Sequence, residues 1–185
     1  MFTINYEIKK KVEGRKLLLI APGKSVLENK EEIQQFIAEN NPVIISINHN
    51  DEIIETDFIF ISNIRRFSQL SKSVYEKTIS TSNIKTKETY ASIDYYQLLN
   101  AVDAVRDNAG LMAIKFVINE LEPTDIYVAG LDGYSKDAHI HYESDELMVY
   151  MSDKLLSQMN EGMKIVLSEY RKLSDIKFIT PSILV

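Results

Sequence analysis

Short apolar runs that alternate with helix-like segments are the feature that most constrains the fold of this chain. The runs at 16–21 (KLLLIA) and 42–47 (PVIISI) are continuous and rich in branched residues, which is typical of strands buried on both faces. Similar runs predict further strands at 57–62, 76–81, 124–132 and 175–180. Strands that alternate with helices build right-handed β-α-β units, so the pattern predicts a mainly parallel sheet.

Amphipathic or apolar segments fill the intervals between these strands. After the first strand, Ile33, Phe36 and Ile37 share one face of a helix. Residues 108–122 are apolar nearly all round, which predicts a helix packed closely against the sheet. A long helix is predicted over 147–173, where apolar residues recur at steps of three and four: Met148, Met151, Leu155, Met159, Met163, Val166, Tyr170 and Leu173.

These elements together predict a three-layer α/β fold, in which helices cover both faces of a mainly parallel, Rossmann-like sheet. Residues 16–185 are expected to form this single domain, and residues 1–15 a polar lead-in or a linker. The length of 185 residues and the 45% of hydrophobic residues suit one domain with a sizeable core. The pattern at 82–107 is ambiguous.

The composition narrows the classes of partner. A net charge of −6, with basic and acidic residues interleaved, argues against nucleic acid, because binding phosphates needs a clustered basic face. The chain has no cysteine, which excludes disulfides and thiol catalysis. No apolar run reaches the roughly 18 residues that span a bilayer, and residues 1–16 lack the apolar centre of a secretory signal. We therefore expect a cytoplasmic protein without a membrane span.

Small and polar residues follow the predicted strands. In parallel sheets of this kind, ligands bind beyond the carboxyl ends of the strands. The candidate binding residues at these ends and at the start of the 108–122 helix are Gly23, Lys24, Ser25, Asn48, Asn63, Asn108, Gly110 and Asp132. Ordinary turn formation, helix capping and close packing explain Gly23, Ser25 and the Asn108–Gly110 turn equally well.

The turn APGKS, which follows the first strand, contains the last three residues of a phosphate-binding P-loop but not the rest of it. The first glycine of that motif would fall at Leu18, and Pro22 removes a backbone donor. The dinucleotide fingerprint is also missing, because Gly23 is the only glycine in the turn. The second strand is followed by Asn48 and Asn50 instead of the acid that binds a ribose. NAD and FAD are therefore not expected.

Two histidines, His139 and His141, lie in the polar stretch that follows Asp132. A histidine there is a candidate general acid or base, because its unperturbed pKa is close to neutrality. Two histidines without further spaced ligands do not make a metal site, and none is predicted. His49 directly follows a strand, where a binding role and an idle loop position are both open.

Several of these stretches together resemble a known group of domains. APGKS, NAG, GLDGY and the closing IKFITPSILV resemble segments of sialyltransferase-like and 6-hydroxymethylpterin-pyrophosphokinase-like Rossmann domains. The turn LIAPGKS, the segment SNIRR at 62–66 and the stretch AGLDGYS are similar to a more specific family. This family is the C-terminal domain attached to HMG-CoA-lyase-like aldolases (4-hydroxy-2-oxovalerate type) of bacterial surface-polysaccharide clusters.

The resemblance implies a nucleotide or nucleotide-sugar crevice for a CMP- or CDP-type ligand, with glycosyltransferase-like chemistry in surface-carbohydrate synthesis. It places His139 or His141 in the position of a catalytic histidine. An aldolase activity would belong to a barrel that this chain does not contain. Two alternatives stay open. One is a non-catalytic accessory domain that docks on, or dimerises, an aldolase partner in cis or in trans; whether this chain also forms a homo-oligomer stays open. The other is a metal-dependent pyrophosphokinase or phosphohydrolase that uses Asp132 and the histidine pair.

Overall fold

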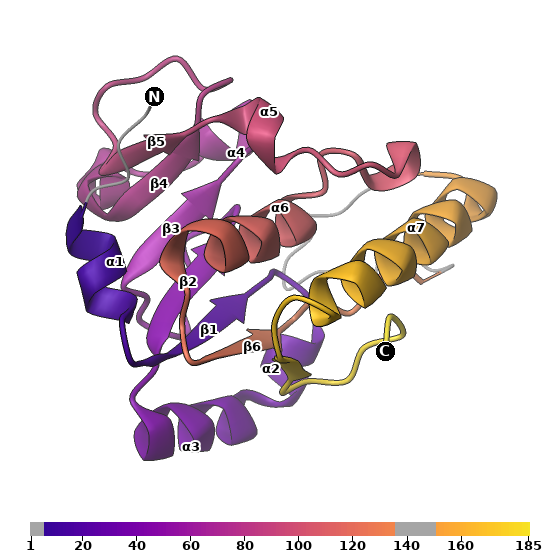
Figure 1. Ribbon diagram of the computed structural model, residues 1–185, viewed down its shortest axis with the longest axis horizontal. Helices are drawn as coiled ribbons and strands as arrows, with labels where there is room; N and C mark the ends of the chain where they lie inside the picture. Colours follow the sequence, from indigo (N-terminus) through magenta and orange to yellow (C-terminus); the bar gives the residue numbers. More distant parts are fainter. Residues whose placement is uncertain (1–5, 136–150) are drawn as a thin grey trace.

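A single sheet of seven parallel strands forms the centre of the molecule (Figure 1). The computed structural model describes residues 6–135 and 151–185. The strands are β1 (Lys16–Ile20), β2 (Val43–Ile47), β3 (Phe58–Ile61), β4 (Thr78–Thr81), β5 (Ala91–Ile93), β6 (Asp125–Ala129) and β7 (Ile176–Phe178). Their order in the sheet is β5-β4-β3-β2-β1-β6-β7, and every neighbouring pair is parallel. The Rossmann-like α/β prediction is confirmed.

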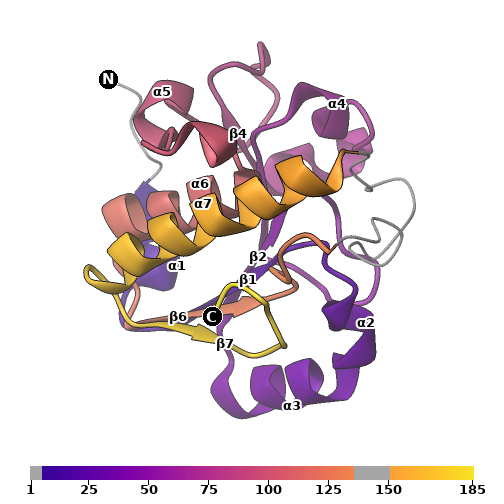
Figure 2. The same ribbon diagram turned by 90° about the vertical axis from the view of Figure 1, so that its right-hand side faces the viewer.

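Helices cover both faces of the sheet (Figures 1 and 2). The α-helices are α1 (Tyr6–Val12), α2 (Ser25–Glu28), α3 (Lys30–Asn40), α4 (Ile64–Phe67), α5 (Tyr95–Leu98), α6 (Ala109–Phe116) and α7 (Asp153–Arg171). The segments η1 (Lys72–Lys77) and η2 (Asp103–Val105) are 3₁₀ helices, and η3 (Val117–Leu121) is a π-helical continuation of α6. No helix among the residues described is long and apolar enough to cross a membrane.

Side chains alternate between two cores, one on each face of the sheet. Leu17 and Leu19 of β1 pack into the larger core under α1, α5, α6 and α7. Leu18 and Ile20 point the other way, into a smaller core that contains Ile33 of α3. This alternation is what a pleated strand imposes, and it explains why β1 is apolar without interruption.

Helix α1 precedes the expected start of the domain but belongs to the packed unit. Ile8 and Val12 are buried in the larger core. The first packed element therefore begins before residue 16, within the stretch for which the sequence predicts a polar lead-in. Its burial rests on two apolar residues one helical turn apart, a signal too short to separate from chance.

The chain reverses direction across the sheet next to β1. Strands β1 to β5 progress toward one edge, and β6 then pairs with the other side of β1. The point between β1 and β6 is the topological switch point, where ligands of such sheets bind at the carboxyl ends of the strands. The polar strand ends predicted from the sequence meet at this edge.

Two elements, β5 and α7, are not fully predicted by the sequence. Strand β5 lies in the stretch whose pattern is ambiguous and has only three residues. Helix α7 begins at Asp153, where the Ser152 side chain accepts a hydrogen bond from the Leu155 N–H; the predicted residues before 151 lie outside the described part. Of the predicted apolar stripe, Met163, Val166 and Tyr170 are buried. The members Met151, Leu155 and Leu173 are exposed.

Candidate functional site

A pocket of about 260 Å³ lies at the carboxyl ends of β1, β2, β3 and β6, beside the start of α6. Six of the predicted binding residues line it: Gly23, Asn48, Asn63, Asn108, Gly110 and Asp132. Its other lining residues are Ala21, Pro22, Ile47, Ser62, Arg66, Asp107, Ala109, Gly130, Leu131, Gly133, Tyr134 and Met163. The remaining two predicted residues, Lys24 and Ser25, do not belong to the lining.

Glycines allow the backbones at the ends of β1 and β6 to pack in direct contact. A Cβ added at Gly23 would lie 2.1 Å from the Gly130 carbonyl oxygen, and one at Gly130 would lie 2.0 Å from the Ala21 carbonyl oxygen. Gly130 also has a φ of 72°, which L side chains rarely adopt. Gly23 is therefore required by close packing of backbone on backbone at this wall of the pocket.

Asp132 closes the turn that follows β1. Its carboxylate accepts a hydrogen bond from the Ser25 backbone N–H at 3.0 Å and another from the Ser25 hydroxyl. The Ser25 oxygen also lies 2.9 Å from the Thr180 hydroxyl, and Thr180 accepts a bond from the Gly130 N–H. Ser25 is buried by these partners, so its hydroxyl points into the protein. We name Ala21, Gly23, Gly130 and Asp132 the β1–β6 side of the pocket.

Lys24 points away from this turn. Its ammonium group pairs with Glu28, one helical turn further along, at 3.5 Å, and its side chain is 44% exposed. Such an exposed pair contributes little to stability. Lys24 thus lies on the surface, although the sequence places it among the candidate binding residues.

The opposite wall comes from the ends of β2 and β3. Asn48 has a φ of 61°, and its side-chain oxygen accepts a hydrogen bond from the Ser62 N–H at 3.0 Å. Asn63 caps α4, with its side-chain oxygen accepting from the Arg65 and Arg66 N–H groups. Both asparagine oxygens are therefore engaged in shaping the backbone. We name Asn48, Ser62, Asn63 and Arg66 the β2–β3 side of the pocket.

The pocket lining carries charge of both signs. Among the lining residues that the structure describes, Arg66 is the cation, and Asp107 and Asp132 are the acids. The Arg66 guanidinium donates to the Gln69 side chain at 3.3 Å. Asp107 accepts from the Tyr95 hydroxyl at 3.2 Å, and the pKa of Tyr95 is raised by burial and by this carboxylate. Residues of both charge signs therefore line one pocket.

The start of α6 lines the pocket between its β1–β6 side and its β2–β3 side. The Asn108 side chain caps the helix by accepting from the Leu111 N–H at 3.1 Å. A Cβ at Gly110 would lie 2.6 Å from Leu131, so this glycine allows the helix to pack on the end of β6. The first N–H groups of a helix, in α6 those of Ala109 and Gly110, have no acceptor within the helix. Both residues line the pocket.

Tyr134 is held in place by two other elements. The Asn160 amide of α7 accepts from the Tyr134 N–H at 2.7 Å and donates to the Tyr134 carbonyl at 2.5 Å. The Tyr134 hydroxyl accepts from the Asn108 side chain at 3.2 Å. These bonds connect α7, the end of β6 and the cap of α6, and they fix one wall of the pocket.

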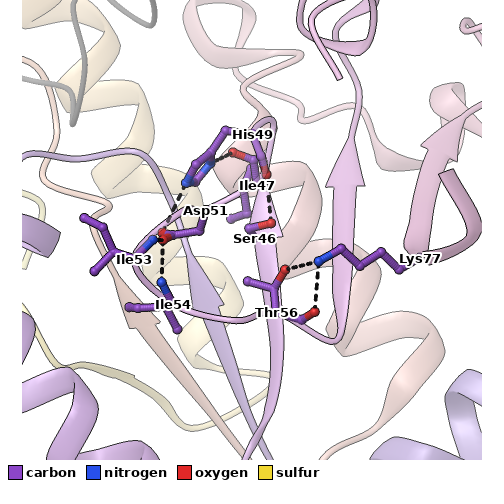
Figure 3. A network of polar contacts seen from close by, with 8 residues as sticks. All are labelled: Ser46, Ile47, His49, Asp51, Ile53, Ile54, Thr56 and Lys77. Carbon is purple, nitrogen blue, oxygen red and sulfur yellow. Dashed lines mark hydrogen bonds and ion pairs between the residues drawn. The ribbon is translucent and has the colours of Figure 1, made fainter. Parts of the chain in front are cut away.

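His49 and Asp51 form a buried pair in the loop after β2 (Figure 3). The His49 Nδ1 lies 2.9 Å from the Ile47 carbonyl oxygen and Nε2 lies 3.4 Å from Asp51. Burial alone would raise the pKa of Asp51. The hydrogen bonds from His49 and from the Ile54 and Ile53 N–H groups outweigh it and lower the pKa. The pair therefore shapes the loop beside Asn48 and lies outside the pocket lining.

The predicted catalytic residues His139 and His141 lie outside the described residues. Within residues 6–135 and 151–185, no group of three or more His, Asp or Glu side chains lies where it could hold a metal ion. The part of the pocket that the structure describes contains hydrogen-bonding groups and charged side chains.

The chain gives no significant match to a protein-family model, to a curated protein or to a solved structure. The fold and the site define its class: a Rossmann-like α/β domain with a polar pocket at the switch point of its sheet.

The sequence alone does not identify three residues of the site: Arg66, Tyr134 and Asn160. In the sequence, Arg66 is noted only as part of the segment SNIRR, and Tyr134 only as part of GLDGY. Asn160 lies within an amphipathic helix, where a polar residue on the buried face is the one available hint.

Proposed function

We propose that this chain is a nucleotide or nucleotide-sugar binding domain that acts in bacterial surface-carbohydrate synthesis, with glycosyltransferase-like chemistry. The observation that carries the proposal is the polar pocket at the switch point between β1 and β6. Nucleotides bind at this place in many sheets of the same architecture, which supports the proposal by analogy of fold.

The size of the pocket limits how much of such a ligand it encloses. A volume of about 260 Å³ is below the roughly 300–1,000 Å³ of pockets that enclose a drug-sized molecule. The described cavity therefore suits one part of a nucleotide sugar at a time, such as its phosphate with the adjoining sugar.

An accessory docking role is the second candidate. Large apolar side chains are exposed on α7, directly after α7 and on the segment after β7: Ile165, Leu173, and Ile183 with Val185, respectively. Exposed apolar residues mark an interface only where they form a continuous patch. A pocket lined by polar strand ends favours ligand binding over docking alone.

A calorimetric titration with CMP, CDP, UDP and GDP tests the proposed function. We expect at least one of them to bind and to raise the melting temperature. In the variant Ala109→Leu, extra carbons at the pocket wall should weaken that binding by about tenfold or more. Ala104→Leu changes an exposed residue and is the matched control. If no nucleotide binds to the unaltered protein, the proposed function is wrong and the docking role is favoured.

A further inference from the structure

The turn after β1 is the part of the sequence most similar to a phosphate-binding loop, yet its anion position is already filled. The Asp132 carboxylate accepts from both the N–H and the hydroxyl of Ser25. The Ser25 N–H and hydroxyl are two of the donors that a turn of this kind would offer to a phosphate. Pro22, which has no N–H, adds none. A ligand phosphate placed there would lie against a carboxylate of the same charge.

The charges of the pocket favour the opposite wall. Arg66 is on the β2–β3 side, while Asp132 is on the β1–β6 side. A guanidinium presents a planar set of donors that matches two phosphate oxygens at once. The start of α6 lines the same pocket and adds the partial positive charge of a helix N-terminus.

We propose that Arg66 binds the anionic group of the ligand, a phosphate, and that the β1 turn does not. This inference rests on the proposed ligand-binding role of the pocket. It places the phosphate away from Gly23, Lys24 and Ser25, which the sequence puts among the candidate binding residues. Sugar or ribose hydroxyls, which donate hydrogen bonds, then lie toward the acids Asp107 and Asp132.

The neighbouring arginine supplies a matched control. Arg65 and Arg66 are adjacent in α4, and Asn63 caps both backbone N–H groups. Arg65 is exposed and is not part of the pocket lining. Arg65→Gln and Arg66→Gln therefore remove the same charge from the same helix, but only the second removes it from the pocket. Arg66→Lys keeps the charge and loses the planar fork.

The experiment measures binding of inorganic phosphate, CMP and cytidine at constant ionic strength, with melting temperatures to verify folding. We expect phosphate and CMP to bind the unaltered protein, and cytidine to bind at least about tenfold more weakly than CMP. Arg66→Gln should weaken phosphate and CMP by about tenfold or more, Arg66→Lys by less, and Arg65→Gln by less than about twofold.

The outcomes separate the inference from the proposed function. Phosphate that binds through Arg66 while no nucleotide binds supports the anion site and refutes the nucleotide. CMP that binds as tightly to Arg66→Gln as to Arg65→Gln, or no more tightly than cytidine, overturns the inference and leaves the proposed function in place. If neither phosphate nor any of CMP, CDP, UDP and GDP binds to the unaltered protein, both are wrong.

Discussion

The two sides of the pocket are built from similar short polar turns, but they use their hydrogen-bonding groups differently. On the β1–β6 side, the Ser25 N–H and hydroxyl both donate to Asp132, and glycines allow the backbone segments to pack closely. On the β2–β3 side, the asparagines hold the backbone while a cationic side chain reaches the pocket. In this protein, the glycine-containing turn after β1 therefore already carries a carboxylate of the protein itself.

This difference between the two sides has separate consequences for the stability of the fold and for the affinity for a ligand. Groups that bond to one another contribute to the stability of the fold, whereas groups placed for a ligand contribute to affinity. Substitutions on the β1–β6 side should therefore lower stability and spare phosphate binding, whereas substitution of Arg66 should weaken phosphate binding.

The largest expected effect is that of Gly23→Ala. The added Cβ would lie 2.1 Å from the Gly130 carbonyl oxygen, and both groups are backbone. We expect a loss of about 3 kcal/mol in the free energy of unfolding, measured by urea titration. Gly14→Ala is the control, because Gly14 has a φ of 70° and nothing within 4 Å of an added Cβ. It should lose only the roughly 1–2 kcal/mol of a left-handed backbone. Equal losses in the two variants would contradict close packing at Gly23.

Ser25→Ala should have a smaller effect of the same kind. The variant removes the hydroxyl that lies between Asp132 and Thr180, and the buried partners lose a hydrogen bond. We expect a loss of about 1–3 kcal/mol in the free energy of unfolding, with the affinity for inorganic phosphate unchanged. Ser157→Ala, at an exposed position of α7, should change stability by less than about 0.5 kcal/mol. A stable Ser25→Ala protein that binds phosphate tenfold more weakly would place the anion back at the β1 turn.

The smallest expected effect is that of Asp51→Asn, in the loop beside Asn48 of the β2–β3 side, and this effect on stability depends on pH. The pKa of Asp51 is lower in the folded protein than its usual value of 3.8, so its ionised form stabilises the fold. That contribution is fully present above the unfolded pKa and is lost as the pH falls through the folded pKa. Asp51→Asn should cost about 1–2 kcal/mol at pH 7, and the gap to the unaltered protein should close as the pH falls below about 4.

Urea titrations at a series of pH values measure this gap. Glu52→Gln, which changes the exposed neighbour, is the control and should not produce it. A gap that stays constant from pH 7 to pH 3 would show that the charge of Asp51 does not support this loop.

The sequence predicts the architecture because strands buried on both faces have a strong local signature. The apolar runs at 16–21, 42–47, 57–62 and 124–132 correspond to β1, β2, β3 and β6. Strand β5 has no such signature: it is short, two of its three residues are only half-buried, and its one partner is β4. Pairing with a neighbour, and not its own composition, makes it a strand.

The location of the pocket was predictable from the sequence, but its internal bonding was not. Parallel strands put their carboxyl ends at one edge, so the residues after each strand had to meet. The hydrogen bond between Ser25 and Asp132 joins residues 107 positions apart in the chain, and no local sequence pattern predicts it. The same holds for the amide of Asn160 on the backbone of Tyr134.

The segment after β7 gives this domain a particular order of assembly. Thr180 bonds the Gly130 N–H, the Ser182 hydroxyl donates to the Leu131 carbonyl, and the Ile183 N–H donates to the Asp132 carbonyl. During synthesis, strands β1 to β5 emerge from the ribosome first, while the pocket edge waits for residues 180–184. The carboxyl edge of the sheet, and with it the pocket, is therefore complete only once the segment 180–184 has packed against it.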